Sequence, residues 1–178
     1  WRYIIGDVVE FDSVPRPGFG DRSGPARLRI VGRHRHFVNA FGENLIVEEI
    51  EKAVVAAAER ARVPFGEFTA APVYPEGARR SGLELAIEWP GGADAMPCFA
   101  EAFDATLRAI NVDYNIKRTD NLGMAPATVT PVPPGTFHAW MESRGRLGGQ
   151  NKCPRCANHR EYLEGVIATA SARPATPG

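Results

Sequence analysis

The chain has 178 residues, which is enough for one domain with a hydrophobic core, or for one domain and part of another. Lysine and arginine together number 21, as do aspartate and glutamate, and this balance argues against a general nucleic-acid binder. Hydrophobic residues make up 44% of the chain, and no apolar run approaches the roughly 18 residues of a membrane-spanning helix. We therefore expect a cytoplasmic protein that contacts neither membranes nor nucleic acid.

The first 36 residues predict a hairpin followed by a linker. Residues 3–11 are rich in β-branched and aromatic side chains, and residues 26–31 return as a second strand. The proline- and glycine-rich residues 12–25 form the loop between them. The run 32–36 (GRHRH) predicts the linker. Because the chain opens on Trp1 rather than on methionine, we expect it to be the interior of a longer protein.

The strongest helical pattern covers residues 47–62. Its apolar residues recur at three- to four-residue spacing, glutamates gather near its start, and Pro64 stops it. The residues before it, 37–44, predict a loop or a short hairpin. Further helices are expected at residues 97–111, at 136–143 with Thr136 as the cap, and at 159–170.

The remaining apolar segments predict strands. They lie at residues 65–73, 83–89 and 127–132. In the second of these, apolar residues alternate with Glu84, Ala86 and Glu88, which predicts a strand with one buried face. Residues 111–117 are expected to be extended or looped, and residues 171–178 to form a disordered tail. Few parallel crossover units are present, so we predict an α+β domain with helices packed on a mixed sheet.

The three cysteines, Cys98, Cys153 and Cys156, are an odd and sparse set, which fits a reducing compartment. Two of them have the spacing Cys-x-x-Cys, and His159 follows. A zinc site usually needs four ligands in two pairs, and this chain offers one pair. We therefore expect no metal site and two semi-buried thiols. A non-catalytic zinc-binding module stays as an alternative.

Lys152 lies in a glycine-rich segment, residues 148–155 (GGQNKCPR). Glycines let the backbone approach a ligand closely, and a lysine ammonium is a compact cation that can meet phosphate or carboxylate oxygens. Pro154 restricts the exit from this segment. The alternative is an ordinary solvated lysine on a surface turn, since most lysines are exposed.

Three further features are candidates for ligand contacts. Asp7 follows a glycine and can accept two hydrogen bonds from a vicinal diol such as ribose, or simply bond its own turn. Arg33 can contact the same ribose or a phosphate, although residues 33–36 also fit a solvated basic run. Gly42, Glu43 and Asn44 form a tight turn that can belong to an active site or merely lead into the helix.

The order of these motifs resembles that of a known superfamily. The motifs are Tyr3-x-x-Gly6-Asp7, Gly32-Arg33, Gly42-Glu43-Asn44-Leu45 and Gln150-Asn151-Lys152-x-Pro154-Arg155. Together they resemble the C-terminal end of adenylate-forming enzymes, the superfamily of acyl-CoA synthetases, peptide-synthetase adenylation domains and luciferases. Residues 111–114, 134–137 and 150–156 more narrowly resemble the auxin-responsive Gretchen-Hagen-type acyl acid amido synthetases. The resemblance covers about residues 1–168.

This resemblance implies an ATP-dependent ligase that adenylates a carboxylic acid and then conjugates it to an amino acid. It assigns Lys152 to catalysis at the α-phosphate, Asp7 and Arg33 to nucleotide binding, and Arg35 to the hinge. Gly42, Glu43 and Asn44 form the active-site loop. ATP, with Mg²⁺, is expected to bind mainly to a missing N-terminal domain. An acyl- or aryl-CoA ligase, which shares the adenylation step, is the alternative.

The resemblance also implies a domain division. Residues 1–33 are expected to be the terminal hairpin of the N-terminal adenylation domain, and residues 34–170 a mobile C-terminal α+β domain. This chain departs from many relatives at Asn44, where they have lysine, and at Arg35, where the wider superfamily often has an acidic residue or lysine. Without the large domain, the chain is expected to be inactive by itself.

Overall fold

The computed structural model describes residues 7–13, 27–33, 37–38, 45–77, 80–119, 123–145 and 152–172. The chain divides into two compact units, residues 1–35 and 36–178, which we describe separately. The strands are β1 (Asp7–Ser13), β2 (Arg27–Arg33), β3 (Phe37–Val38), β4 (Leu45–Ile46), β5 (Phe68–Val73), β6 (Gly82–Glu88) and β7 (Thr128–Val132). The helices are α1 (Val47–Ala61), η1 (Ala93–Ala95), α2 (Met96–Ile110), α3 (Val112–Arg118), α4 (Thr136–Ser143) and α5 (Glu161–Ala172).

The first unit contains the predicted hairpin, in which β1 and β2 pair antiparallel. One face is apolar and exposed, with Phe11 directly opposite Leu28 and 57% and 54% of these residues accessible to solvent. On the other face, Arg29 Nη2 contacts Glu10 Oε2 at 3.0 Å. The second strand continues through Arg33, so the prediction that the linker begins at residue 32 was wrong. Backbone pairing with β1 extends the strand past Val31.

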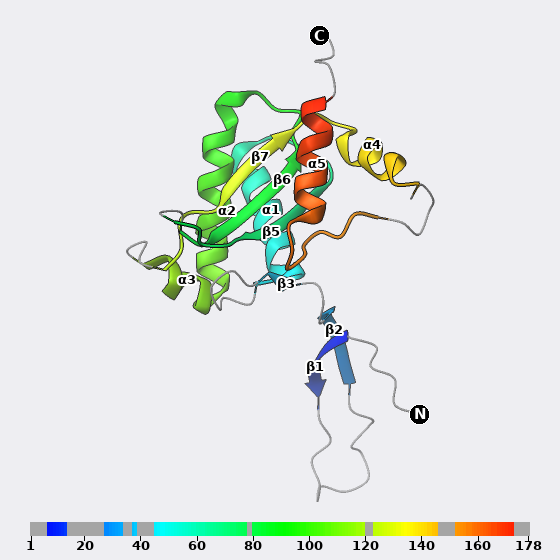
Figure 1. Cartoon of the computed structure of the whole chain (residues 1–178). Coiled ribbons are helices and arrows are strands. Elements are labelled where there is room, and N and C mark those ends of the chain that lie inside the picture. Colours follow the sequence, from blue (N-terminus) through cyan, green and yellow to red (C-terminus); the bar gives the residue numbers. More distant parts are fainter. Residues whose placement is uncertain are drawn as a thin grey trace, which may run out of the picture. The chain divides into compact units, whose positions relative to one another are not determined.

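The second unit is built on a three-stranded mixed sheet in the order β5-β6-β7. Strands β5 and β6 are antiparallel, whereas β6 and β7 are parallel. Helices α1 and α2 pack on one face, and α4 and α5 pack on the other (Figure 1). Strands β3 and β4 pair antiparallel before α1. Of the two alternatives for residues 37–44, a loop or a short hairpin, this pairing fits the hairpin. This arrangement confirms the predicted α+β class.

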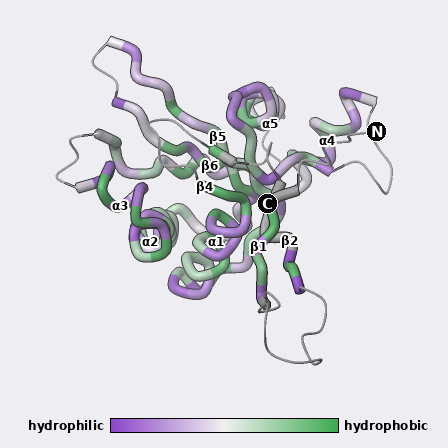
Figure 2. Tube along the Cα trace, turned by 90° about the horizontal axis from the view of Figure 1, so that it is seen from below, coloured by the Kyte–Doolittle hydropathy of each residue, from purple (hydrophilic) through white to green (hydrophobic). Residues whose placement is uncertain are grey.

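Strand β6 is buried on both faces, so the prediction of a single buried face was wrong. Leu83, Leu85 and Ile87 pack toward α1 and α2, while Ala86 packs toward α4 and α5. A second helical layer covers the face that carries the glutamates. Figure 2 shows hydrophobic residues along the strands, and both hydrophobic and hydrophilic residues on the helices that cover them.

The two glutamates of β6 are held by specific partners. Glu84 accepts hydrogen bonds from Arg160 Nη2 at 2.7 Å and from Thr130 Oγ1 at 2.8 Å. Glu88 accepts one from the backbone N–H of Phe137 at 3.0 Å, at the start of α4. A buried carboxylate is tolerated only when it is paired or hydrogen-bonded, and both are.

Three local predictions were wrong at helix ends. Residues 112–118 form α3 rather than an extended segment, because the Asn111 side chain caps it by accepting from the Tyr114 N–H at 2.7 Å. Thr136 does not cap α4; its hydroxyl donates to the Pro133 carbonyl at 2.6 Å. Helix α5 continues through Ala172, two residues into the predicted tail, and residues 173–178 lie outside the described residues.

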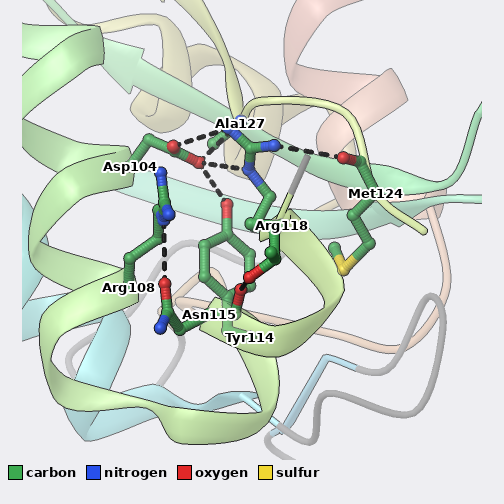
Figure 3. Close-up of polar contacts among 8 residues, drawn as sticks. Asp104, Arg108, Tyr114, Asn115, Arg118, Met124 and Ala127 are labelled. Carbon is green, nitrogen blue, oxygen red and sulfur yellow. Dashed lines mark hydrogen bonds and ion pairs between the residues drawn. The ribbon is translucent and has the colours of Figure 1, made fainter. Parts of the chain in front are cut away.

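A buried ion pair fastens α3 to α2 (Figure 3). Arg118 donates through Nε and Nη2 to the two carboxylate oxygens of Asp104, at 3.0 and 2.9 Å. The Tyr114 hydroxyl donates to the same carboxylate at 2.5 Å, and the Arg118 Nη1 donates to the Met124 carbonyl at 3.1 Å. Burial by itself raises the pKa of Asp104, but the hydrogen bonds from Arg118 and Tyr114 outweigh it and hold that pKa below its ordinary value.

We predict that Asp104→Asn lowers the free energy of unfolding by about 3 kcal/mol, because removing one partner of a buried pair leaves the other charge uncompensated. Urea denaturation at neutral pH measures this. Glu101→Gln is the matched control, since Glu101 is exposed on the same helix and the substitution removes the same charge. That variant should stay within about 0.5 kcal/mol of the parent protein.

The same cluster has a pH signature. Since the folded pKa of Asp104 lies below its ordinary value of 3.8, the stabilisation is present above that value and is lost as the pH falls through the folded pKa. The stability difference between the parent protein and Asp104→Asn should therefore shrink on acidification. A difference that is the same at neutral and acidic pH would contradict this assignment.

Candidate functional site

Lys152 is exposed and directly precedes a segment, residues 153–157, that lies along the outer edge of β5. The Ala70 N–H donates to the Arg155 carbonyl at 2.9 Å, and the Ala157 N–H donates to the Ala70 carbonyl at 3.1 Å. The direction is parallel, with Cys156 paired to Ala70. The residues after Lys152 thus add an isolated β-bridge to the outer edge of the sheet.

Side chains add further anchors to this segment. Thr69 Oγ1 donates to the Pro154 carbonyl at 2.7 Å. Cys153 is buried in the core beneath α4 and α5, while Cys156 is buried in the core beneath α1 and α2. The backbone after Lys152 is therefore tied to both hydrophobic cores of the second unit. This leaves the lysine side chain exposed on a fixed support.

Arg155 is the second cation of the segment. Its guanidinium lies over the ring of Phe68, 4.7 Å from the centroid, and its Nε contacts Glu51 Oε1 at 3.2 Å. About 40% of the Arg155 side chain stays accessible, so the ion pair to α1 contributes little stability. The stacking on Phe68 restricts where the charge lies.

The structure explains the Cys-x-x-Cys spacing without a metal or a redox role. Cys153 and Cys156 point into cores on opposite faces of the sheet, so they cannot share one ion or form a disulfide with each other. The ring of His159 packs against Tyr162 at 4.7 Å between centroids. Within the described part of the chain, no three acidic, histidine or cysteine residues group as metal ligands.

The other predicted site residues belong to different parts of the chain. Asp7 and Arg33 are direct cross-strand partners at one end of the β1–β2 hairpin, so the backbone brings these two positions opposite each other. Lys152 belongs to the second unit. The predicted hinge residue Arg35 and the loop residues 42–44 lie outside the described residues.

Sequence reasoning missed Thr69 and Phe68 as neighbours of the Lys152 segment. They precede Pro154 and Arg155 by more than 80 positions, and β5 reads as an ordinary apolar strand. Residues 154–156 (PRC) were the signal in the sequence that this segment is anchored, because Arg155 and Cys156 make contacts with β5.

The C-terminal domain of the GH3 family matches residues 48–161, more than half of the chain. The chain belongs to the GH3 family. This confirms the family resemblance that the motifs predicted. No curated protein sequence matches the chain. None of the described helices is both long and apolar enough to cross a membrane.

Solved structures share the fold of this GH3 chain. One, a GH3.15 acyl acid amido synthetase, has 18% identity and a TM-score of 0.68 over 92% of this chain and 29% of its own. A second, AtGH3.15 acyl acid amido synthetase in complex with 2,4-DB, has 18% identity and a TM-score of 0.66 over 93% of this chain and 30% of its own. The GH3 chain thus spans less than a third of the length of these two relatives.

The burial of two thiols leads to a prediction about their reactivity. Burial raises the pKa of Cys153 and of Cys156 to about 12, whereas Cys98 is exposed. At pH 8, an aromatic disulfide reagent should therefore titrate one thiol quickly in the folded chain and three in denaturant. Rapid reaction of two or three thiols in the native chain would contradict the described burial.

Proposed function

We propose that this chain is the C-terminal portion of an ATP-dependent ligase that adenylates a carboxylic acid and conjugates it to an amino acid through an amide bond. The observation that carries the proposal is the placement of Lys152. Its side chain is exposed, and the backbone beside it is anchored to both cores of a GH3 C-terminal domain. A cation on a fixed support is suited to a reaction in which negative charge develops on phosphate oxygens.

In the proposed adenylation step, the carboxylate of the acid attacks the α-phosphate of ATP and pyrophosphate leaves. Charge builds on the non-bridging oxygens of the α-phosphate, and the Lys152 ammonium offsets it. A preorganised group of this kind contributes roughly 10²–10³ in rate. In the second step, the neutral amine of an amino acid attacks the acyl carbon, the C–O bond to AMP breaks, and the amine loses a proton as the amide forms. The α-phosphate is then part of the leaving group and not the site of attack, so this step does not require the lysine in the same position.

The nucleotide is assigned to the first unit and to the domain expected before it. Asp7 accepts from the ribose hydroxyls, and Arg33, directly opposite in the hairpin register, contacts the same ribose or a phosphate. Mg²⁺ is assigned mainly to the preceding domain. The exposed apolar face of the hairpin supports this division, because a two-stranded hairpin needs a further layer to be stable.

We further propose that residues 1–33 complete that N-terminal domain and that residues 34–170 move about Arg35 between the two half-reactions. Such a motion would carry Lys152 to the nucleotide for adenylation and away from it for amide formation. The turn formed by Gly42, Glu43 and Asn44 would then face the acyl-adenylate. The compact second unit, with its own two cores, is the kind of rigid body that such a rotation requires.

In a full-length protein that contains this chain, Lys152→Ala should slow adenylation roughly 10²–10³-fold and leave amide formation from a preformed acyl-adenylate nearly unchanged. Single-turnover assays of each half-reaction measure the two rates. Lys52→Ala is the control, since Lys52 is also exposed and forms an ion pair with Glu48 on the same helix. Equal losses in both half-reactions would rule out this role for Lys152.

Asp7→Ala should weaken ATP binding tenfold or more. Hydrogen bonds to charged groups are worth about 1.5–3 kcal/mol, and about 1.4 kcal/mol corresponds to a factor of ten. Isothermal titration of the full-length protein with ATP measures the change. Glu10→Ala on the same strand is the control, because its exposed contact with Arg29 contributes little. If the two variants lose the same affinity, Asp7 does not bind the ribose.

A further inference from the structure

The hydroxyl of Thr69 holds Pro154, the second residue after Lys152. Its Oγ1 donates to the Pro154 carbonyl at 2.7 Å, and the Cys153 thiol is a second, weaker donor to the same carbonyl at 3.6 Å. Thr69 lies on β5 and is 1% exposed. Because the contact is shielded from water, removing the hydroxyl leaves the Pro154 carbonyl with only the weaker thiol donor, in a place where water cannot readily replace the hydroxyl.

Apart from the burial of the Cys153 side chain, the other anchors of the segment act farther along the chain. The backbone hydrogen bonds with Ala70 reach Arg155 and Ala157, three and five positions after Lys152. The ion pair between Arg155 and Glu51 is 40–45% accessible and is screened by solvent. Without Thr69, these contacts would still hold the edge strand in place. The direction in which the chain leaves that strand toward Lys152 would be less restricted.

We propose that Thr69 is a positioning residue for Lys152. It fixes the position of the Lys152 backbone relative to the edge of β5. The position of the backbone in turn fixes where the ammonium lies when it contacts the α-phosphate. This inference rests on the proposed function, since it assigns a support to the cation of the adenylation step. A displacement of about 1 Å in a reacting group can cost up to 10²-fold in rate, so one buried hydroxyl is enough to matter.

The test compares Thr69→Val with Thr69→Ser in the full-length protein. The valine variant removes the donor while keeping the shape, and the serine variant restores it. The control is Thr136→Val, because Thr136 is also fully buried and also donates to a proline carbonyl, that of Pro133 at 2.6 Å. Thermal unfolding of every variant ensures that rates are compared where each protein is folded.

The measurement is ATP–pyrophosphate exchange with the acid that the parent protein uses fastest from a panel of aromatic carboxylic acids that includes 2,4-DB. We expect Thr69→Val to slow exchange about tenfold, within the range that a misplaced group can cost. Thr69→Ser should recover most of the rate and Thr136→Val should match the parent protein. Amide formation from a preformed acyl-adenylate should be the same in all four proteins.

A double-mutant cycle shows whether the effect passes through Lys152. In a Lys152→Ala background, Thr69→Val should cause no further loss of exchange, because there is no ammonium left to misplace. A further tenfold loss in that background, or an equal loss in Thr136→Val, would overturn the positioning role while leaving the proposed function intact. If Lys152→Ala itself leaves exchange unchanged, the proposed function and the positioning role are both wrong.

Discussion

The burial of β6 on both faces is the constraint on which the second unit depends. One face packs against α1 and α2 through Leu83, Leu85 and Ile87, and the other packs against α4 and α5. The second face carries Glu84 and Glu88, whose carboxylates would be costly to bury alone. Arg160, directly before α5, bonds Glu84, and the backbone N–H of Phe137 in the first turn of α4 bonds Glu88. The same hydrogen bonds therefore satisfy the buried charges and fix both covering helices on the sheet.

The segment after Lys152 uses this sheet as its support. Residues 153–157 complete the edge of β5 and place one cysteine in each core. The stability of the unit and the placement of the lysine are thus linked through the same contacts. A site on a sheet edge is positioned more rigidly than one on a free loop, which suits the role proposed for Lys152. It also suits the proposed movement of this unit between the two half-reactions, since the lysine then moves with the sheet.

The fold class and most elements could be predicted from the sequence because local patterns specify them. The apolar spacing of α1 and the alternation in β6 identified a helix and a strand at nearly their observed bounds. The errors arose where a distant residue decided the outcome. Helix α3 depends on the cap supplied by Asn111 and on the buried pair between Asp104 and Arg118. The sequence of residues 111–117 does not show that Asp104 on α2 pairs with Arg118.

The candidate site divides in the same way. Lys152 could be identified as a candidate from the glycines before it and the Pro-Arg-Cys residues at 154–156. The order of the motifs predicted the family, which the family model confirms. Those are properties of residues close together in the chain. The partners of the segment could not be identified, since Thr69 and Phe68 meet Pro154 and Arg155 only once β5 offers its outer edge. The sequence by itself determined which chemical groups are available and which family they belong to. Only the tertiary structure decided which buried hydroxyl, ring and cores hold the segment after Lys152, because contacts across more than 80 residues depend on how the layers pack.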